Sequence, residues 1–224
     1  MRVWPPLPRQ PSVPAPPPMT EARYPVTTVD LLRHGDCLGG AILRGRTDSP
    51  LSGEGWQQMR RALQPHAGWT RVVASPLQRC FDFATRFARE QDIPLEKRDD
   101  FRELDFGDWD GLTPSQIAAR DPLLAENVYR EPEAFCPPGG ESLDTARQRI
   151  VAAWEPLIKA HAGGHLLLVV HGGTIRLLLE HLLQSPHLAR YMAIPMACLT
   201  RLCLYHTPEG LYPQLLFHQP EPRT

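Results

Sequence analysis

The chain has 224 residues, a length that suits one α/β domain with a buried core. Its 24 Lys and Arg residues and 25 Asp and Glu residues are scattered along the chain, and the formal net charge of −1 argues against a basic face for nucleic acid or an anionic membrane. No apolar run reaches the roughly 18 residues of a membrane span, and the first residues lack a signal-peptide pattern, so we expect a cytoplasmic protein.

Residues 1–24 are rich in proline and lack apolar periodicity, which predicts an extended, disordered tail. We interpret this tail as a dispensable extension rather than a docking peptide, with Met19 as an alternative start of translation. Residues 25–220 are expected to form the single folded domain.

Strands and helices are predicted to alternate along most of this domain. The first strand covers about 26–32 and ends at Arg33-His34-Gly35. The next predicted elements are a helix over 54–63, a strand over 71–74, a helix over 77–89, a short edge strand over 93–97, an irregular loop over 103–113, and helices over 113–120 and 142–160.

The clearest strand signal is the continuous apolar run from Leu166 to Val170, which is typical of a strand buried on both faces of a parallel sheet. A helix over 174–183 follows, and a hairpin of strands 199–205 and 211–217 closes the domain. This alternation predicts an α/β fold, specifically a three-layer α/β/α sandwich with a mostly parallel central sheet.

The predicted strands are followed by side chains suited to an oxyanion, in the order Arg33 and His34, then Arg79, then His171. Ligands of such folds bind at the carboxyl ends of the strands, so these side chains are expected to meet there. Arginine matches phosphate oxygens with a planar fork of donors. The amides of Gly172 and the next glycine, at a predicted helix N-terminus, would complete an anion site.

His34 is the candidate nucleophile, because a bond from Nδ1 to a backbone carbonyl would leave Nε2 free to attack phosphorus. The arginine and histidine side chains would neutralise the transferring group, so neither a metal ion nor another cofactor is required. The leaving group needs a proton. Four carboxylates in one loop are candidates for that donor, and composition alone makes Glu103 only a modest favourite over Asp105, Asp108 and Asp110.

Residues 28–217 resemble the histidine phosphatase superfamily, the phosphoglycerate-mutase-like proteins. The resemblance rests on four motifs: Leu32-Arg33-His34-Gly35, Ser75-Pro76-Leu77-Gln78-Arg79, Arg102-Glu103-Leu104-Asp105-Phe106-Gly107 and Val170-His171-Gly172-Gly173-Thr174-Ile175-Arg176. It implies that 25–220 is a catalytic domain for a small-molecule phosphomonoester. It also implies that His34 is phosphorylated, that Arg33, Arg79 and His171 hold the phosphate, and that Glu103 is the proton donor.

Within that superfamily, the stretches 45–52, 104–111 and 137–142 look most similar to the α-ribazole phosphatase branch. This likeness implies removal of the 5′-phosphate of α-ribazole 5′-phosphate in cobalamin biosynthesis, with Arg46 as a further phosphate contact. One departure is Gly40, which stands where many members carry an asparagine that contacts the phosphate. Trp109 either walls the substrate pocket or packs the loop.

Three other functions compete with this one. A broad-specificity small-molecule phosphatase is the main alternative, because the same residues would hydrolyse many phosphomonoesters. A mutase is disfavoured because the chain reaches its next helix soon after the loop of Glu103, without the long insertion that mutases of this superfamily usually carry there. A non-catalytic binding protein is disfavoured because every residue of the predicted phosphate pocket is present.

Overall fold

A six-stranded sheet forms the centre of the computed structural model, which describes residues 24–120, 122, 136–185, 188 and 191–220. Of the predicted proline-rich tail, residues 1–24, only Tyr24 is among the described residues, and Met19 lies outside them. The strands are β1 (Val26–Arg33), β2 (Arg71–Ala74), β3 (Leu95–Lys97), β4 (His165–Val170), β5 (Leu199–Thr207) and β6 (Gly210–Gln219), and their order across the sheet is β3-β2-β4-β1-β5-β6.

Four neighbouring strands, β3, β2, β4 and β1, run parallel, and β5 and β6 add an antiparallel hairpin beside β1. The sheet is therefore mostly parallel, and β3 is the edge strand that the sequence predicts. In β4, Leu167 and Val169 pack into one apolar cluster, whereas Leu166, Leu168 and Val170 pack into another. A strand buried on both faces has no polar face, which explains its unbroken apolar run.

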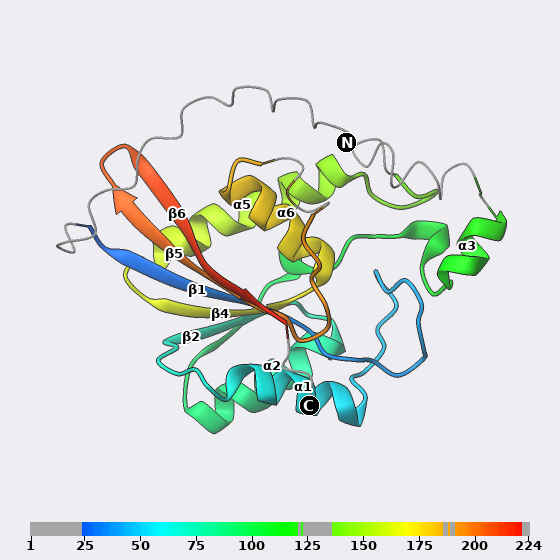
Figure 1. Cartoon of the computed structure of the whole chain (residues 1–224), viewed down its shortest axis with the longest axis horizontal. Coiled ribbons are helices and arrows are strands. Elements are labelled where there is room, and N and C mark those ends of the chain that lie inside the picture. The colour runs from blue at the N-terminus through cyan, green and yellow to red at the C-terminus, as the bar shows by residue number, and fades with distance from the viewer. Residues whose placement is uncertain (1–23, 121, 123–135, 186–187, 189–190, 221–224) are drawn as a thin grey trace, which may run out of the picture.

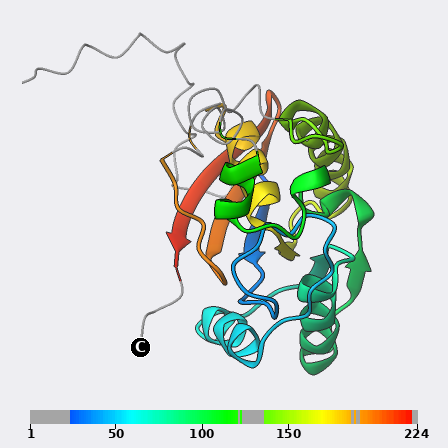
Figure 2. The same ribbon diagram turned by 90° about the vertical axis from the view of Figure 1, so that its right-hand side faces the viewer.

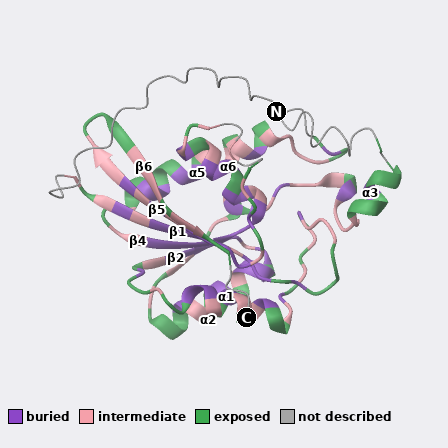
Figure 3. Ribbon diagram, in the orientation of Figure 1, coloured by how far each residue is buried: buried purple, intermediate pink, exposed green. Residues whose placement is uncertain are grey.

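Helices cover both faces of this sheet (Figures 1 and 2). α1 (Gly53–Leu63) and α2 (Gln78–Gln91) lie on one face, and α5 (Leu143–Ala160) and α6 (Gly172–Leu182) on the other. Their inward sides are buried and their outward sides exposed (Figure 3). The predicted three-layer α/β/α sandwich is thus confirmed. In the described part of the chain, no helix is long and apolar enough to cross a membrane.

The chain that follows β3 is irregular. Short 3₁₀ turns form at η1 (Asp99–Phe101) and η2 (Gly107–Trp109), followed by the small helix α3 (Pro114–Arg120). Trp109 is buried against Ile117, so it packs this loop rather than walling a pocket.

Local polar groups fix where the helices begin. Ser52 caps α1 by accepting a hydrogen bond from the Gly55 amide at 3.0 Å, and Ser142 caps α5 in the same way. α6 begins at Gly172, two residues earlier than the sequence predicts. Its first turn therefore starts directly at the carboxyl end of β4, which places the positive end of the helix at that edge of the sheet.

One charged side chain is fully buried within β1. Asp30 has 0% exposure, and its two carboxylate oxygens accept hydrogen bonds from Arg201 Nε and Nη2, each at 2.7 Å. Trp69 Nε1 donates to the same carboxylate at 2.7 Å, and His165 Nε2 lies 3.0 Å from it. Asp30 and Arg201 are opposite each other in the β1–β5 register, so the sheet itself brings the buried carboxylate and the partly buried guanidinium together.

Candidate active site

Four of the predicted site residues meet at the carboxyl edge of the parallel strands. Arg33 ends β1 and His34 directly follows it, His171 follows β4, and Arg79 lies in the first turn of α2. Because β1 and β4 are adjacent, the rings of His34 and His171 come within 5.4 Å of each other, measured between centroids, in an edge-to-face arrangement. The structure thus brings together residues that are up to 138 positions apart in the sequence (171 minus 33).

His34 has one ring nitrogen fixed and the other available. Its Nδ1 lies 2.8 Å from the backbone carbonyl of Gly35. A carbonyl only accepts, so Nδ1 carries the proton and Nε2 carries the lone pair. Among the described residues, none occupies Nε2 with a hydrogen bond. This is the tautomer that the sequence argument requires of a nucleophile.

His171 is held from both sides. Arg79 Nε, which only donates, lies 3.2 Å from His171 Nδ1, so Nδ1 is the acceptor. Nε2 therefore carries the proton and donates it to the hydroxyl of Ser75 at 2.6 Å. Ser75 is fully buried, and its role as a partner of His171 was missed by the sequence argument. The only available signal was its place at the end of β2, beside the other strand ends.

Both histidines are neutral. Burial, followed by the positive charges of Arg79 and Arg33, holds the pKa of His34 well below its ordinary value. Burial and the charge of Arg79 likewise hold the pKa of His171 well below the ordinary value. A neutral imidazole keeps the lone pair that a nucleophile needs, so His34 Nε2 stays unprotonated at neutral pH.

The two arginines are cations without a carboxylate partner. Arg79 is fully buried, and Arg33 Nε is buried with no hydrogen-bond partner, although Arg33 Nη1 donates to the carbonyl of Ile194. In the described part of the chain, no carboxylate lies within ion-pair distance of either guanidinium. Burial lowers the pKa of Arg33, and the nearby charge of Glu103 only partly offsets this. Burying charge without a counter-charge is costly, so this pair suits a bound anion.

Glu103 lies beside the first turn of α6. Its Oε2 accepts a hydrogen bond from the Gly173 amide at 3.2 Å, and its Oε1 accepts from the amide of Leu104 at 3.1 Å. A Cβ on Gly173 would lie 2.5 Å from Glu103 Oε1, so only glycine leaves room for this carboxylate. The Gly173 amide thus serves Glu103, which corrects the prediction that it faces a bound anion. Gly172 lies against Arg33, where a Cβ would come within 3.3 Å of the guanidinium Nε.

The other carboxylates of the loop have different partners. Asp105 accepts from the Gly107 amide at 3.0 Å and pairs with Arg46 at 2.8 Å. Asp110 accepts from backbone amides of residues 45–47. Asp108 is exposed. Of the four candidates for the proton donor, Glu103 is the one whose charge acts on Arg33.

Two residues singled out in the sequence lie outside this buried cluster. The side chain of Arg46 is 74% exposed and ion-paired with Asp105, at the rim rather than beside His34. Gly40 is exposed, with a positive φ of 77° that favours glycine, and its carbonyl accepts a hydrogen bond from Arg44 Nη2. Arg44 thus holds the loop at Gly40.

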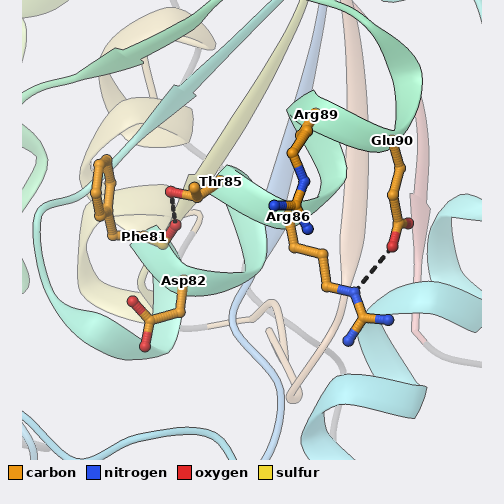
Figure 4. A pocket seen from close by; sticks show the side chains of 6 residues that line it. All are labelled: Phe81, Asp82, Thr85, Arg86, Arg89 and Glu90. Atoms are coloured by element: carbon orange, nitrogen blue, oxygen red, sulfur yellow. Dashed lines mark hydrogen bonds and ion pairs between the residues drawn. The ribbon is translucent and has the colours of Figure 1, made fainter.

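A separate surface pocket of about 440 Å³ lies on the outer side of α2 (Figure 4). It contains none of the predicted site residues. It is lined by Phe81, Asp82, Thr85, Arg86, Arg89 and Glu90.

The fold and these side chains define the class: an α/β sandwich with two neutral histidines and two buried arginines at the carboxyl edge of its parallel strands. Residues 29–211 match the family model of the histidine phosphatase superfamily (branch 1). The chain belongs to this superfamily.

Among curated relatives, the chain is 37% identical over 172 residues to a bifunctional protein of Mycobacterium tuberculosis. That match covers 75% of this chain and 47% of the relative, so the chain spans about half the length of that protein. It is also 34% identical over 172 residues to the glucosyl-3-phosphoglycerate phosphatase of M. tuberculosis, covering 70% of this chain and 75% of the relative.

Solved structures show the same architecture. The mycobacterial glucosyl-3-phosphoglycerate phosphatase superposes with a TM-score of 0.76 and 28% identity, covering 85% of this chain and 97% of that one. A protein described as a putative α-ribazole-5′-P phosphatase of Escherichia coli superposes with a TM-score of 0.74 over 86% and 96% of the two chains, but at 19% identity this likeness concerns the fold alone.

Proposed function

We propose that this protein is a metal-independent phosphomonoesterase that acts through a phosphohistidine on His34. The observation that carries the proposal is the pairing of a neutral histidine, whose Nε2 lone pair is available, with two buried arginines that have no carboxylate partner among the described residues. A phosphoryl dianion supplies the counter-charge that Arg33 and Arg79 lack.

In the first step, the lone pair of His34 Nε2 attacks phosphorus in line with the leaving oxygen. The N–P bond forms as the ester P–O bond breaks, and the electron pair of that bond goes to the leaving alkoxide. Arg33 and Arg79 neutralise the non-bridging oxygens. The Gly35 carbonyl holds the Nδ1 proton and stabilises the positive charge that develops on the imidazole ring.

Glu103, in its protonated form, gives the alkoxide a proton. In the second step, the resulting carboxylate takes a proton from water as the water oxygen attacks the phosphohistidine, the N–P bond breaks, and inorganic phosphate and neutral His34 are released. Two backbone amides hold this carboxylate, and its charge acts on Arg33; both observations support the role of Glu103 in the two proton transfers.

Two substrates are candidates. The motifs at 45–52, 104–111 and 137–142 support α-ribazole 5′-phosphate. The 34% identity to a glucosyl-3-phosphoglycerate phosphatase supports a phosphorylated glycerate that carries a sugar. Among the solved structures, the phosphatase of that name is 28% identical to this chain and the one described as an α-ribazole phosphatase is 19% identical. Arg46, at the exposed rim, is proposed to contact the part of the substrate beyond the phosphate or the phosphate itself.

The activity is tested by hydrolysis of p-nitrophenyl phosphate with wild-type protein and His34→Ala, each with and without a chelator. We expect turnover by the wild type in both conditions and none by the variant. Equal activity of the two proteins would refute the mechanism. Comparing kcat/KM for α-ribazole 5′-phosphate, glucosyl-3-phosphoglycerate, phosphoglycerates and nucleotides then separates the substrates; a flat profile indicates a broad-specificity phosphatase.

A further inference from the structure

Segment 44–47 connects two charged groups that do not touch each other. On one side, its carbonyls accept hydrogen bonds from the buried guanidinium of Arg79. Nη2 donates to Arg44 O at 2.9 Å and to Gly45 O at 3.1 Å, and Nη1 donates to Thr47 O at 2.9 Å. Together with the hydrogen bond from Nε to His171 Nδ1, the Arg79 guanidinium donates four hydrogen bonds, and it has five N–H groups in all.

The opposite side of the same segment faces Asp110. Its carboxylate accepts hydrogen bonds from three consecutive backbone amides, those of Gly45, Arg46 and Thr47, at 2.5 to 3.2 Å. The segment is also closely packed there, because a Cβ on Gly45 would lie 2.4 Å from the carbonyl of Leu104. Asp110 therefore fixes the peptide planes whose carbonyls hold Arg79.

This arrangement has an electrostatic advantage for a phosphate site. A carboxylate placed directly on Arg79 would fix it but would also neutralise the charge that a phosphate needs. Backbone carbonyls fix the guanidinium while leaving it a net cation. The negative charge of Asp110 is separated from Arg79 by the backbone of residues 45–47, whose three N–H groups donate charge-assisted hydrogen bonds to the carboxylate.

We propose that Asp110 is a positioning residue for Arg79, acting through the backbone of residues 45–47; this inference rests on the proposed role of Arg79 in holding the phosphate. The three amides that donate to Asp110 belong to the segment whose carbonyls hold Arg79, so Asp110 is assigned a positioning role and not that of the proton donor. Its effect on the reaction is transmitted by the orientation of Arg79.

The first test compares Asp110→Asn with the control Asp108→Asn. Asp108 belongs to the same loop, is exposed, and makes no side-chain hydrogen bond with segment 44–47. An asparagine at 110 offers one acceptor in place of two and turns an NH₂ group toward backbone donors. We expect a roughly 10- to 100-fold loss in affinity for inorganic phosphate, measured by calorimetry, and a similar loss in kcat/KM, because a displacement of about 1 Å has effects of this size. The control is expected to change neither quantity by more than about twofold.

The decisive test is a double-mutant cycle with Arg79→Ala. When Arg79 is absent, Asp110→Asn is expected to weaken phosphate binding by less than about twofold. An equal loss with and without Arg79 would overturn the proposal, because Asp110 would then act only on the stability of the loop. If Asp110→Asn does not fold, Asp110→Glu, which keeps the charge but displaces it, is taken through the same cycle with the same two outcomes.

Phosphate binding also separates this proposal from the proposed function. If the wild type binds phosphate but hydrolyses no phosphomonoester, the proposed activity fails, while the cycle on phosphate affinity still decides the role of Asp110. If hydrolysis depends on His34 but the cycle is additive, the activity stands and the role of Asp110 is refuted.

Discussion

Gly173 offers the sharpest test of the proposed proton donor, because its missing side chain makes room for Glu103. A Cβ at this position would lie 2.5 Å from Glu103 Oε1 and 2.4 Å from Leu104 Cδ1. Restoring an ordinary contact of about 3.5 Å requires a shift of roughly 1 Å in the carboxylate or in the first turn of α6. Gly173→Ala therefore displaces Glu103 without altering its chemistry.

The expected effect depends on the leaving group. A misplacement of about 1 Å costs on the order of 100-fold in rate for a step that uses the displaced group. An alkoxide leaving group needs the proton of Glu103, whereas p-nitrophenolate is stable without it. We therefore expect Gly173→Ala to lower kcat/KM on the order of 100-fold for glycerol phosphate, and by less than about 10-fold for p-nitrophenyl phosphate.

Steady-state kinetics with both substrates measure the ratio of these losses. Glu103→Gln is expected to show the same leaving-group dependence, and Gly53→Ala is the matched control, because a Cβ on Gly53 meets nothing within 4 Å. Equal losses for the two substrates in Gly173→Ala would refute the assignment of Glu103 as the acid, since the substitution would then disturb phosphate binding or the nucleophile.

Three further predictions concern stability and the histidines. Asp30→Ala leaves the Arg201 guanidinium without its buried partner and is expected to lower the free energy of unfolding by about 3–5 kcal/mol in urea denaturation. Because burial lowers the pKa of His34, the unfolded chain takes up a proton below about pH 6.5 that the folded chain does not, and the free energy of unfolding therefore falls as the pH drops. Replacing His34 with Gln is expected to reduce the slope of the free energy of unfolding against pH by up to about 1.4 kcal/mol per pH unit. Ser75→Ala removes the acceptor of His171 Nε2 and is expected to lower both kcat and stability, the latter by about 1–3 kcal/mol.

Each of these predictions has a result that contradicts it. For Asp30, the control is Glu90→Ala, which removes an exposed ion-pair partner and is expected to change the free energy of unfolding far less than Asp30→Ala does. Similar losses for both variants would show that burial adds nothing. An unchanged slope of stability against pH would show that His34 titrates alike in the folded and unfolded chains. Full activity of Ser75→Ala would show that Arg79 alone orients His171.

Much of the fold follows from local sequence, and the exceptions have physical reasons. The apolar run of β4 and the pattern of α1 are local signals, and both elements begin within one residue of the predicted start and end where predicted. The early start of α6 was missed because Gly172 and Gly173 have low helix propensity, and their conformation is set instead by packing against Arg33 and Glu103.

The buried ion pair in the sheet could not be predicted from either partner. Asp30 interrupts an apolar strand, and Arg201 is 171 residues further along the chain. Only the antiparallel register of β1 and β5 places them opposite each other. A polar residue inside an apolar run signals that a partner exists, but the identity of that partner depends on strand order, which local patterns do not contain.

The acidic loop shows the same limit at the site itself. Glu103 and Asp110 are carboxylates in one short loop, and composition gives no reason to assign them different tasks. Their backbone partners separate them: Glu103 accepts from the Gly173 amide beside Arg33, whereas Asp110 accepts from three amides of a segment whose carbonyls hold Arg79. Backbone amides donate to both oxygens of each carboxylate, but the amides that hold Glu103 lie beside Arg33, whereas those that hold Asp110 belong to the segment that holds Arg79. The division of roles depends on which peptide groups each side chain faces. We therefore expect Glu103→Asp to impair proton transfer and Asp110→Glu to impair phosphate binding.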